Sequence, residues 1–211
     1  MKTVLFLGDS ITDWYRRREE EFNLGEGYVL LNAAKLTLDY PNQYKVINRG
    51  VSGNRSADIY ARLESDVFFF KPDYLTLLMG VNDVWHNDWG GGVSTAKFEK
   101  MLKMICEETE TAVKGVKIIL MSPFVLEGEA TVSETDKNRY ANFKSSVLEK
   151  AEVMKKYAAE KNYPFIELQP IFDNAAKEFS ANYLTLDGVH PTPAGHELIS
   201  RKWMEKFKEI V

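Results

Sequence analysis

Five short apolar runs alternate with longer segments of helical periodicity, and this alternation restricts the fold more than any other feature of the chain. The runs have strand character and are Val4–Leu7, Lys45–Asn48, Tyr74–Met79, Lys117–Met121 and Phe165–Leu168. Strands that alternate with helices pair in parallel through crossover connections, which are nearly always right-handed. We therefore predict an α/β fold, a three-layer α/β/α sandwich with a five-stranded parallel sheet covered on both faces.

The segments between and after these runs carry apolar residues at helical spacing. The first ends before Pro41, the longest spans Asn138–Lys161, and the last follows Pro193. The positions expected to face the core are Tyr28, Leu31, Leu36 and Leu38; Ile59, Leu63 and Val67; Phe98 to Val113; Phe143, Val147, Leu148, Ala151 and Met154; and Leu198, Ile199, Trp203 and Phe207. No repeat, low-complexity tract or linker divides the chain, so we expect residues 1–211 to form a single domain.

Composition excludes several classes of protein. The 211 residues are 45% hydrophobic and carry a formal net charge of -4, which is ordinary for a globular protein and argues against a nucleic-acid binder. The basic run Arg16–Arg18 is followed at once by Glu19–Glu21, and we expect this segment to be solvated. No apolar segment is long enough to cross a bilayer, and the run before Gly8 is too short for a signal peptide. The single cysteine, Cys106, lies at a core position of a helix, so we expect no internal disulfide, no membrane partner and a cytoplasmic location.

The sequence Gly-Asp-Ser-Ile-Thr, residues Gly8 to Thr12, directly follows the first predicted strand. Glycine lets the backbone turn sharply where the strand ends. Ser10 is thereby delivered to the carboxyl end of a strand, where open α/β sheets place their ligand sites. A serine at this edge is a candidate nucleophile if a base, an orienting acid and oxyanion donors lie nearby.

Two further strand ends offer donors for a developing negative charge. After the second strand, two close glycines suggest a bent backbone, and the N–H of Gly53 is a candidate oxyanion donor; the alternative is a tight turn in which Asn54 or Ser56 caps the next helix. After the third strand, the amide of Asn82 is another candidate donor, with an Asx-turn or helix cap as the alternative. We expect Asp83 to have a supporting role there.

The stretch Asp187–His196 offers an acid and a base. His190 can take the proton of a serine hydroxyl and return it to a leaving group. Asp187, three residues earlier in a turn-rich loop, can hold the other ring nitrogen of His190. His86 and His196 compete as the base, although His196 lies inside the start of the last helix, where packing or local hydrogen bonding is expected.

Taken in order, these four blocks resemble those of the GDSL or SGNH hydrolase superfamily, and the resemblance covers nearly the whole chain. It implies a flavodoxin-like α/β/α sandwich in which Ser10 is the nucleophile, His190 the base and Asp187 its partner. It also implies an oxyanion hole formed by the N–H groups of Ser10 and Gly53 and by the Asn82 amide. The serine does not lie in the Gly-x-Ser-x-Gly elbow of ordinary α/β-hydrolases.

Within that superfamily, the chain is most similar to microbial acetylxylan esterases and related sugar deacetylases. The similar segments are Gly27-Tyr28-Val29, Asn48 to Asn54, Val81 to Trp85 and Met121 to Phe124. Several aromatic residues follow the catalytic stretches closely, and aromatic faces stack well on sugar rings. The residues expected to contact substrate are Asp9, Trp14, Trp85 and His86, with Tyr15 and Trp89 nearby. The alternative is that these aromatics pack the loops or form an interface between copies of the chain in a homo-oligomer.

We therefore expect a serine esterase that removes O-acetyl groups from xylo-oligosaccharides or related sugars through an acyl-enzyme, with no metal and no organic cofactor. Three alternatives remain. The first is a lysophospholipase or thioesterase acting on longer acyl chains. The second is a non-catalytic flavodoxin-like module that binds a phosphate at Gly8–Thr12. The third is a metal-dependent phosphoesterase using Asp9, Asp13, Asp83, Asp187 and His190.

Overall fold

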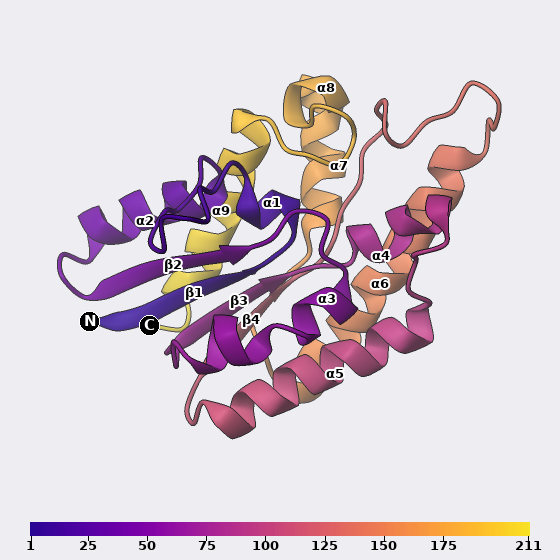
Figure 1. Ribbon diagram of the computed structural model, residues 1–211. Coiled ribbons are helices and arrows are strands. Elements are labelled where there is room, and N and C mark those ends of the chain that lie inside the picture. Colours follow the sequence, from indigo (N-terminus) through magenta and orange to yellow (C-terminus); the bar gives the residue numbers. More distant parts are fainter.

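A computed structural model describes residues 1–211 and contains one five-stranded sheet (Figure 1). All strand pairs are parallel, in the order β2-β1-β3-β4-β5. The strands are β1 (Lys2–Gly8), β2 (Tyr44–Gly50), β3 (Tyr74–Leu78), β4 (Lys117–Met121) and β5 (Phe165–Ile166). The predicted fold class, an α/β/α sandwich with five parallel strands, is confirmed.

Helices cover both faces of this sheet. One face packs against α2 (Tyr28–Asp39), α7 (Leu168–Phe179) and α9 (Pro193–Lys208). The other packs mainly against α3 (Ser56–Tyr60), α5 (Thr95–Ala112) and the second half of α6 (Arg139–Lys161). Figure 1 shows α2 and α9 on the opposite side of the strands from α3 and α5. The remaining elements are short: α1 (Ser10–Asp13), a π-helical turn (Glu64–Phe68), α4 (Val81–Trp85), a 3-10 turn (His86–Trp89) and α8 (Ala181–Leu184).

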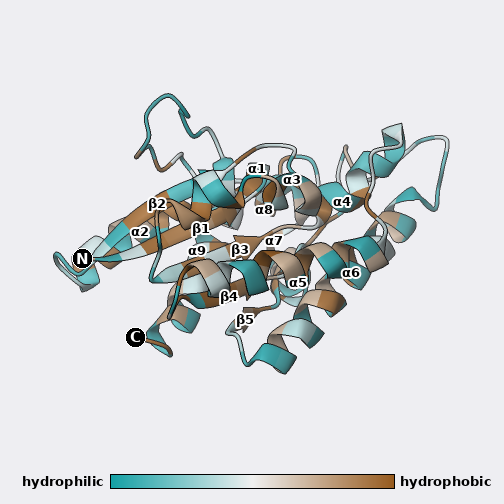
Figure 2. Ribbon diagram, turned by 60° about the horizontal axis from the view of Figure 1, so that its bottom comes forward, coloured by the Kyte–Doolittle hydropathy of each residue, from teal (hydrophilic) through white to brown (hydrophobic).

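Beyond their first residues the central strands β1, β3 and β4 are mainly apolar, as expected for strands that are covered on both faces. In β1, Val4 and Phe6 belong to the core beneath α2 and α9, whereas Leu5 and Leu7 belong to the core beneath α3 and α5. This alternation follows from the period of two in a strand. The hydropathy colouring of Figure 2 shows largely apolar strands in the middle of the molecule and polar residues on the outer sides of the helices. Cys106 is fully buried in the second core, as predicted.

Three expectations about the apolar positions are wrong. Leu38 is 81% exposed because it lies on the face of α2 turned away from the buried Ala33 and Leu36. Leu148 is 41% exposed because it lies outside the buried stripe of α6 that contains Val147 and Met154. The run Phe165–Leu168 contains only two strand residues. Its last residue instead begins α7, where the N–H of Leu168 donates to the Ser122 hydroxyl at 2.9 Å, and this helix was not predicted.

The topology brings the carboxyl ends of the strands to one edge of the sheet. Ser10 follows β1, Gly53 follows β2 and Asn82 lies in α4 just after β3. Both chain termini lie toward the opposite edge, where the strands begin (Figure 1). None of the helices combines the length and the apolarity that crossing a membrane requires.

The centre of the first core gives a test of this packing. Trp203 is fully buried, stacks on Phe207 with ring centroids 4.6 Å apart, and donates its indole N–H to the Thr76 hydroxyl at 2.9 Å. Trp203→Phe leaves a cavity and a buried hydroxyl without its donor, so we expect the free energy of unfolding to fall by about 2–4 kcal/mol in urea denaturation. Leu38→Ala, at an exposed site, should change it by less than about 0.5 kcal/mol. Equal effects of the two substitutions would contradict the assignment of the core.

Candidate active site

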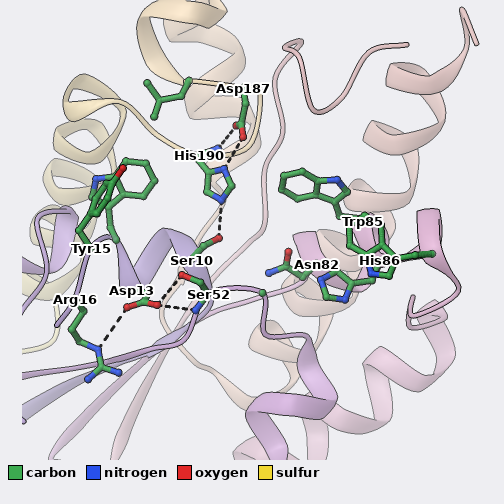
Figure 3. Close-up of a pocket in the computed structure, with 14 residues that line it drawn as sticks. Ser10, Asp13, Tyr15, Arg16, Ser52, Asn82, Trp85, His86, Asp187 and His190 are labelled. Carbon is green, nitrogen blue, oxygen red and sulfur yellow. Dashed lines mark hydrogen bonds and ion pairs between the residues drawn. The ribbon is translucent and has the colours of Figure 1, made fainter. Parts of the chain in front are cut away.

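A cavity of about 600 Å³ opens at the carboxyl edge of the sheet (Figure 3). Its walls come from the segments after β1, β2 and β3 and from the loop before α9. The lining residues are Ser10, Asp13, Trp14, Tyr15, Arg16, Ser52, Gly53, Asn82, Trp85, His86, Trp89, Leu186, Asp187 and His190. All five residues predicted to form the triad and the oxyanion hole are therefore in contact with one cavity.

The position of Ser10 is set by a sharp turn from β1 into α1. A Cβ atom on Gly8 would lie 2.3 Å from the Thr12 hydroxyl oxygen and 2.6 Å from the carbonyl oxygen of Leu78, so only glycine fits there. The Asp9 carboxylate accepts the N–H of Ile11 at 3.0 Å and caps the first turn of α1. Ser10 is the first residue of this helix and points its hydroxyl toward His190 (Figure 3).

His190 lies between Ser10 and Asp187. Its Nε2 is 3.0 Å from Ser10 Oγ, and its Nδ1 is 2.7 Å from Asp187 Oδ2. Because the carboxylate accepts the Nδ1 proton, Nε2 is left to accept the serine hydroxyl. Gly188, with φ +97°, makes the turn that allows an aspartate and a histidine three residues apart to meet.

The carboxylate of Asp187 is held in its charged form. Burial alone raises its pKa, but the ring of His190 and the backbone N–H groups of His190 and Val189 donate hydrogen bonds to it. These donors outweigh the burial and lower the pKa to about 2. Asp187 is therefore ionised throughout the neutral range and keeps the imidazole of His190 in one orientation.

The three predicted oxyanion donors face the same space. The backbone N–H groups of Ser10 and Gly53 have no acceptor within the protein. The Asn82 amide donates one proton to the carbonyl oxygen of Asn54 at 3.1 Å and retains a second one. Gly53 adopts φ +81°, a conformation that favours glycine.

Asp83, the residue after Asn82, ties α4 to the start of α3. It is fully buried, and its carboxylate accepts both the N–H and the hydroxyl of Ser56 at the start of α3. Neither Asn54 nor Ser56 caps α3 through its own side chain, because Asp58 accepts the N–H of Arg55 instead. Burial raises the pKa of Asp83, and the bonds from Ser56 oppose this rise.

Aromatic residues surround Ser10 and His190. The ring of Trp14 lies 5.9 Å from that of His190, and the ring of Trp85 lies 5.7 Å from it. Figure 3 shows Trp85 on the side of His190 opposite Tyr15. The ring of His86 lies 5.0 Å from that of Trp89 at a tilt of 46°, and Trp89 is 63% exposed at the rim of the cavity. The residues Trp14, Trp85 and His86, predicted to contact substrate, all line the cavity.

Asp9, which was also predicted to contact substrate, does not line the cavity. Its side chain is 1% exposed because it turns inward to cap α1. Burial raises its pKa to about 7, partly offset by the N–H of Ile11 and by the nearby His190. The expectation for Asp9 is therefore corrected from a binding residue to a buried part of the turn.

His196 is packed, as the sequence indicated. Its Nδ1 accepts the N–H of Tyr28 at 3.2 Å, at the start of α2, and its ring lies 4.9 Å from Trp14. The residue is 1% exposed, and burial followed by repulsion from His190 lowers its pKa to about 3. A neutral His196 therefore links the start of α9 to the start of α2 and packs against Trp14, which lines the cavity.

The sequence did not reveal one polar cluster beside Ser10. Arg16, expected to be solvated, is 8% exposed and donates to the carbonyl oxygen of Gly50 at 3.0 Å. Asp13 is also buried, and it accepts both the N–H and the hydroxyl of Ser52, each at 2.8 Å. The sequence names Asp13 only as a candidate metal ligand, and its contact with Ser52 has no signal beyond its place three residues after Ser10. The acidic run after Arg16–Arg18 favours a solvated segment and so gives no sign that Arg16 is buried.

The five side chains of the metal-dependent alternative do not converge on one point. Asp13 is bound to Ser52 and Asp83 to Ser56. Asp187 is bound to His190, and Asp9 is buried beneath the turn. No group of three or more His, Cys, Asp or Glu side chains is arranged to hold a metal ion.

Comparison with known proteins points to one family. The model of the GDSL-like Lipase/Acylhydrolase family matches residues 6–198. An acetylxylan esterase from Geobacillus stearothermophilus is 35% identical over 214 residues, covering 97% of this chain and 93% of that protein. The solved structure of Axe2, an acetylxylan esterase from the same organism, matches with a TM-score of 0.85 at 34% identity, over 97% of this chain and 93% of that one.

Other solved structures agree. LAE5, an α/β hydrolase enzyme from the metagenome of Lake Arreo in Spain, matches with a TM-score of 0.86 at 28% identity, over 98% of this chain and 95% of that one. Three catalytic mutants of Axe2 replace a serine, an aspartate and a histidine by alanine. The aspartate and histidine of that enzyme are three residues apart, as are Asp187 and His190.

The burial of neutral His196 predicts a specific acid sensitivity. Between the ordinary histidine pKa of 6.5 and the folded value of about 3, the unfolded chain binds a proton that the folded protein does not. The free energy of unfolding should therefore fall as the pH falls through this window, by up to about 1.4 kcal/mol per pH unit from this residue. Urea denaturation at several pH values should show a shallower dependence for His196→Gln. An unchanged dependence would show that His196 is not buried in its neutral form.

Proposed function

Because the chain belongs to the GDSL-like lipase/acylhydrolase family and is a carboxylic ester hydrolase, we propose that it removes O-acetyl groups from xylo-oligosaccharides or related acetylated sugars. The chemistry proposed is acyl transfer to Ser10, assisted by His190 and Asp187. The observation that carries it is the contact of 3.0 Å between Ser10 Oγ and His190 Nε2. The identity to an acetylxylan esterase supports the substrate class.

In the first half of the reaction, Ser10 Oγ attacks the carbonyl carbon of the ester while His190 Nε2 removes its proton. The imidazolium that forms is stabilised by the ionised Asp187 at 2.7 Å. The carbonyl oxygen gains negative charge and is received by the N–H groups of Ser10 and Gly53 and by the Asn82 amide. His190 then gives its proton to the alcohol oxygen as the ester bond breaks.

In the second half, water takes the place of the alcohol. His190 removes a proton from this water, which attacks the acetyl-Ser10 ester. The same three donors stabilise the second oxyanion, and the proton returns to Ser10 Oγ as the acid leaves. Apart from this water, the steps use only groups of the chain and of the substrate.

The aromatic residues indicate where the sugar would bind. The leaving alcohol must lie near His190 Nε2, because this atom gives it a proton. Trp14 and Trp85 are the aromatic rings closest to His190, at 5.9 and 5.7 Å. A sugar ring held between or against these faces would keep its O-acetyl group over Ser10.

The rival function on longer acyl chains has less support. A long acyl chain needs a groove with extended aliphatic walls. Among the residues that line the cavity, Leu186 is the only aliphatic one, and the others are polar, aromatic or glycine. This composition favours a short acid and a hydroxylated alcohol.

The catalytic roles predict strongly non-additive mutants. Ser10→Ala and His190→Ala should each lower kcat by at least roughly 10³-fold, because each removes one member of a unit that acts together. The double variant should be no more than several-fold worse than either single one. The measurement is the hydrolysis of p-nitrophenyl acetate, with Ser145→Ala, exposed on α6, as the matched control. Retention of activity in Ser10→Ala would overturn the mechanism.

The substrate proposal predicts a steep dependence on the acid. For a series of p-nitrophenyl esters, kcat/KM should fall by roughly tenfold or more between acetyl and hexanoyl, since a pocket built for a short acid rejects added methylenes. Acetylated xylo-oligosaccharides should release acetate, measured by chromatography. A maximum at octanoyl or longer esters would instead support the lysophospholipase or thioesterase alternative. If the protein prefers short acyl esters but releases no acetate from the xylo-oligosaccharides, only the proposed sugar substrate is rejected and the esterase mechanism stands.

A further inference from the structure

Asp13 is a buried carboxylate beside the nucleophile that the proposed reaction does not use. It is the last residue of the four-residue helix α1, three positions after Ser10, and it is 4% exposed. Its Oδ2 atom accepts the backbone N–H and the hydroxyl of Ser52, each at 2.8 Å, and also contacts Arg18. Figure 3 shows Asp13 beneath Ser10, with its bonds directed at Ser52.

Ser52 belongs to the turn that presents the Gly53 N–H. The N–H of Asn54 donates to the carbonyl oxygen of Val51 at 3.1 Å, so residues 51–54 form a β-turn. Gly53 has φ +81° and Ser52 has a negative φ, the combination of a type II turn. Type I and type II turns differ mainly in the orientation of their central peptide. In this turn the central peptide joins Ser52 to Gly53, so its orientation decides where the Gly53 N–H points.

The turn is held from both ends. On one side, Asp13 binds both donors of Ser52. On the other side, the Asn82 amide donates to the carbonyl oxygen of Asn54 at 3.1 Å. Gly53 itself has nothing within 4 Å of the place where a Cβ would lie, so no neighbouring group packs against that side of its Cα. The restraint comes through Ser52 and Asn54.

The support for Asp13 is itself rigid. A Cβ atom on Gly50 would lie 2.1 Å from the backbone nitrogen of Asp13, so the end of β2 and the end of α1 touch through their backbones. Arg16 donates to the carbonyl oxygen of Gly50 and lies beside the Asp13 carboxylate. A carboxylate suits this position because its oxygens can accept several hydrogen bonds at once.

We propose that Asp13 is a positioning residue for the oxyanion hole, which sets the Ser52–Gly53 peptide relative to Ser10. The nucleophile and the anchor of its oxyanion donor then lie on the same helical turn. Any displacement of α1 therefore moves Ser10 and the Gly53 N–H together. This proposal rests on the oxyanion role of Gly53 in the proposed function.

Two variants test it. Asp13→Asn keeps the shape but replaces the shared acceptor by a neutral amide, and Ser52→Ala removes only the hydroxyl bond. Loss of an entire oxyanion donor lowers kcat by roughly 10²–10³-fold. A misplaced donor should cost part of this, so we expect kcat to fall roughly 10- to 100-fold for Asp13→Asn and about 3- to 10-fold for Ser52→Ala. KM should stay within about twofold, because the oxyanion forms after the substrate binds.

A second readout separates positioning from folding. A boronic acid forms a tetrahedral anion on a serine hydroxyl, so its inhibition constant should rise by the same factor as kcat falls. Rates are expressed per active site titrated, and Asp173→Asn is the matched control, since Asp173 pairs with Lys144 away from the cavity. This control should leave kcat and the inhibition constant unchanged.

Each outcome is decisive. If Asp13→Asn and Ser52→Ala both retain kcat within twofold of the wild type, Asp13 does not position the donor. If Asp13→Asn does not fold, Ser52→Ala decides alone, and an unchanged kcat overturns the proposal. Ser10→Ala, run beside them, separates the two hypotheses. Activity retained by Ser10→Ala overturns the proposed function. If Ser10→Ala loses activity while Asp13→Asn and Ser52→Ala are both unaffected, only the role of Asp13 is overturned.

Discussion

The hydrogen bond between Ser10 and His190 is the interaction on which the rest of the structure depends. It joins residues 180 positions apart, at 3.0 Å, and so requires the two ends of the chain to meet above one edge of the sheet. Parallel strands make this meeting possible because all of them end at that edge. The sharp turn after β1 places Ser10, the proposed nucleophile, and the Asp187–His190 loop before α9 places His190, the proposed base.

The same physical device stabilises each of the loops around this contact. In each case one carboxylate accepts two or more donors. The half-buried Asp187 accepts them from its own loop, whereas the buried Asp83 and Asp13 accept them from Ser56 and Ser52 of other segments. One acceptor-only side chain can therefore order several backbone groups without a large apolar core. Loops held in this way lose little freedom when the charge of the transition state develops, which is the condition for electrostatic stabilisation.

Much of this arrangement could be predicted from local patterns. The run Lys117–Met121 was predicted at its exact strand bounds, and the blocks around Ser10, Asn82 and His190 fall at the sheet edge. The predictions that were wrong concern features that depend on tertiary contacts. Helix α7 begins at Leu168, within an apolar run, because β5 pairs for just two residues with β4. The burial of Arg16 depends on the close approach of Gly50 to α1, which no local pattern reveals.

The central claim is that the hydroxyl of Ser10 is activated by His190. The most direct measurement is to treat the protein with a fluorophosphonate, which phosphonylates activated serines, and to locate the adduct by mass spectrometry. We expect one adduct, on Ser10, formed in step with the loss of esterase activity and absent from the His190→Ala variant. Complete inactivation with the adduct on another residue would contradict the claim, as would esterase activity that survives full labelling of Ser10.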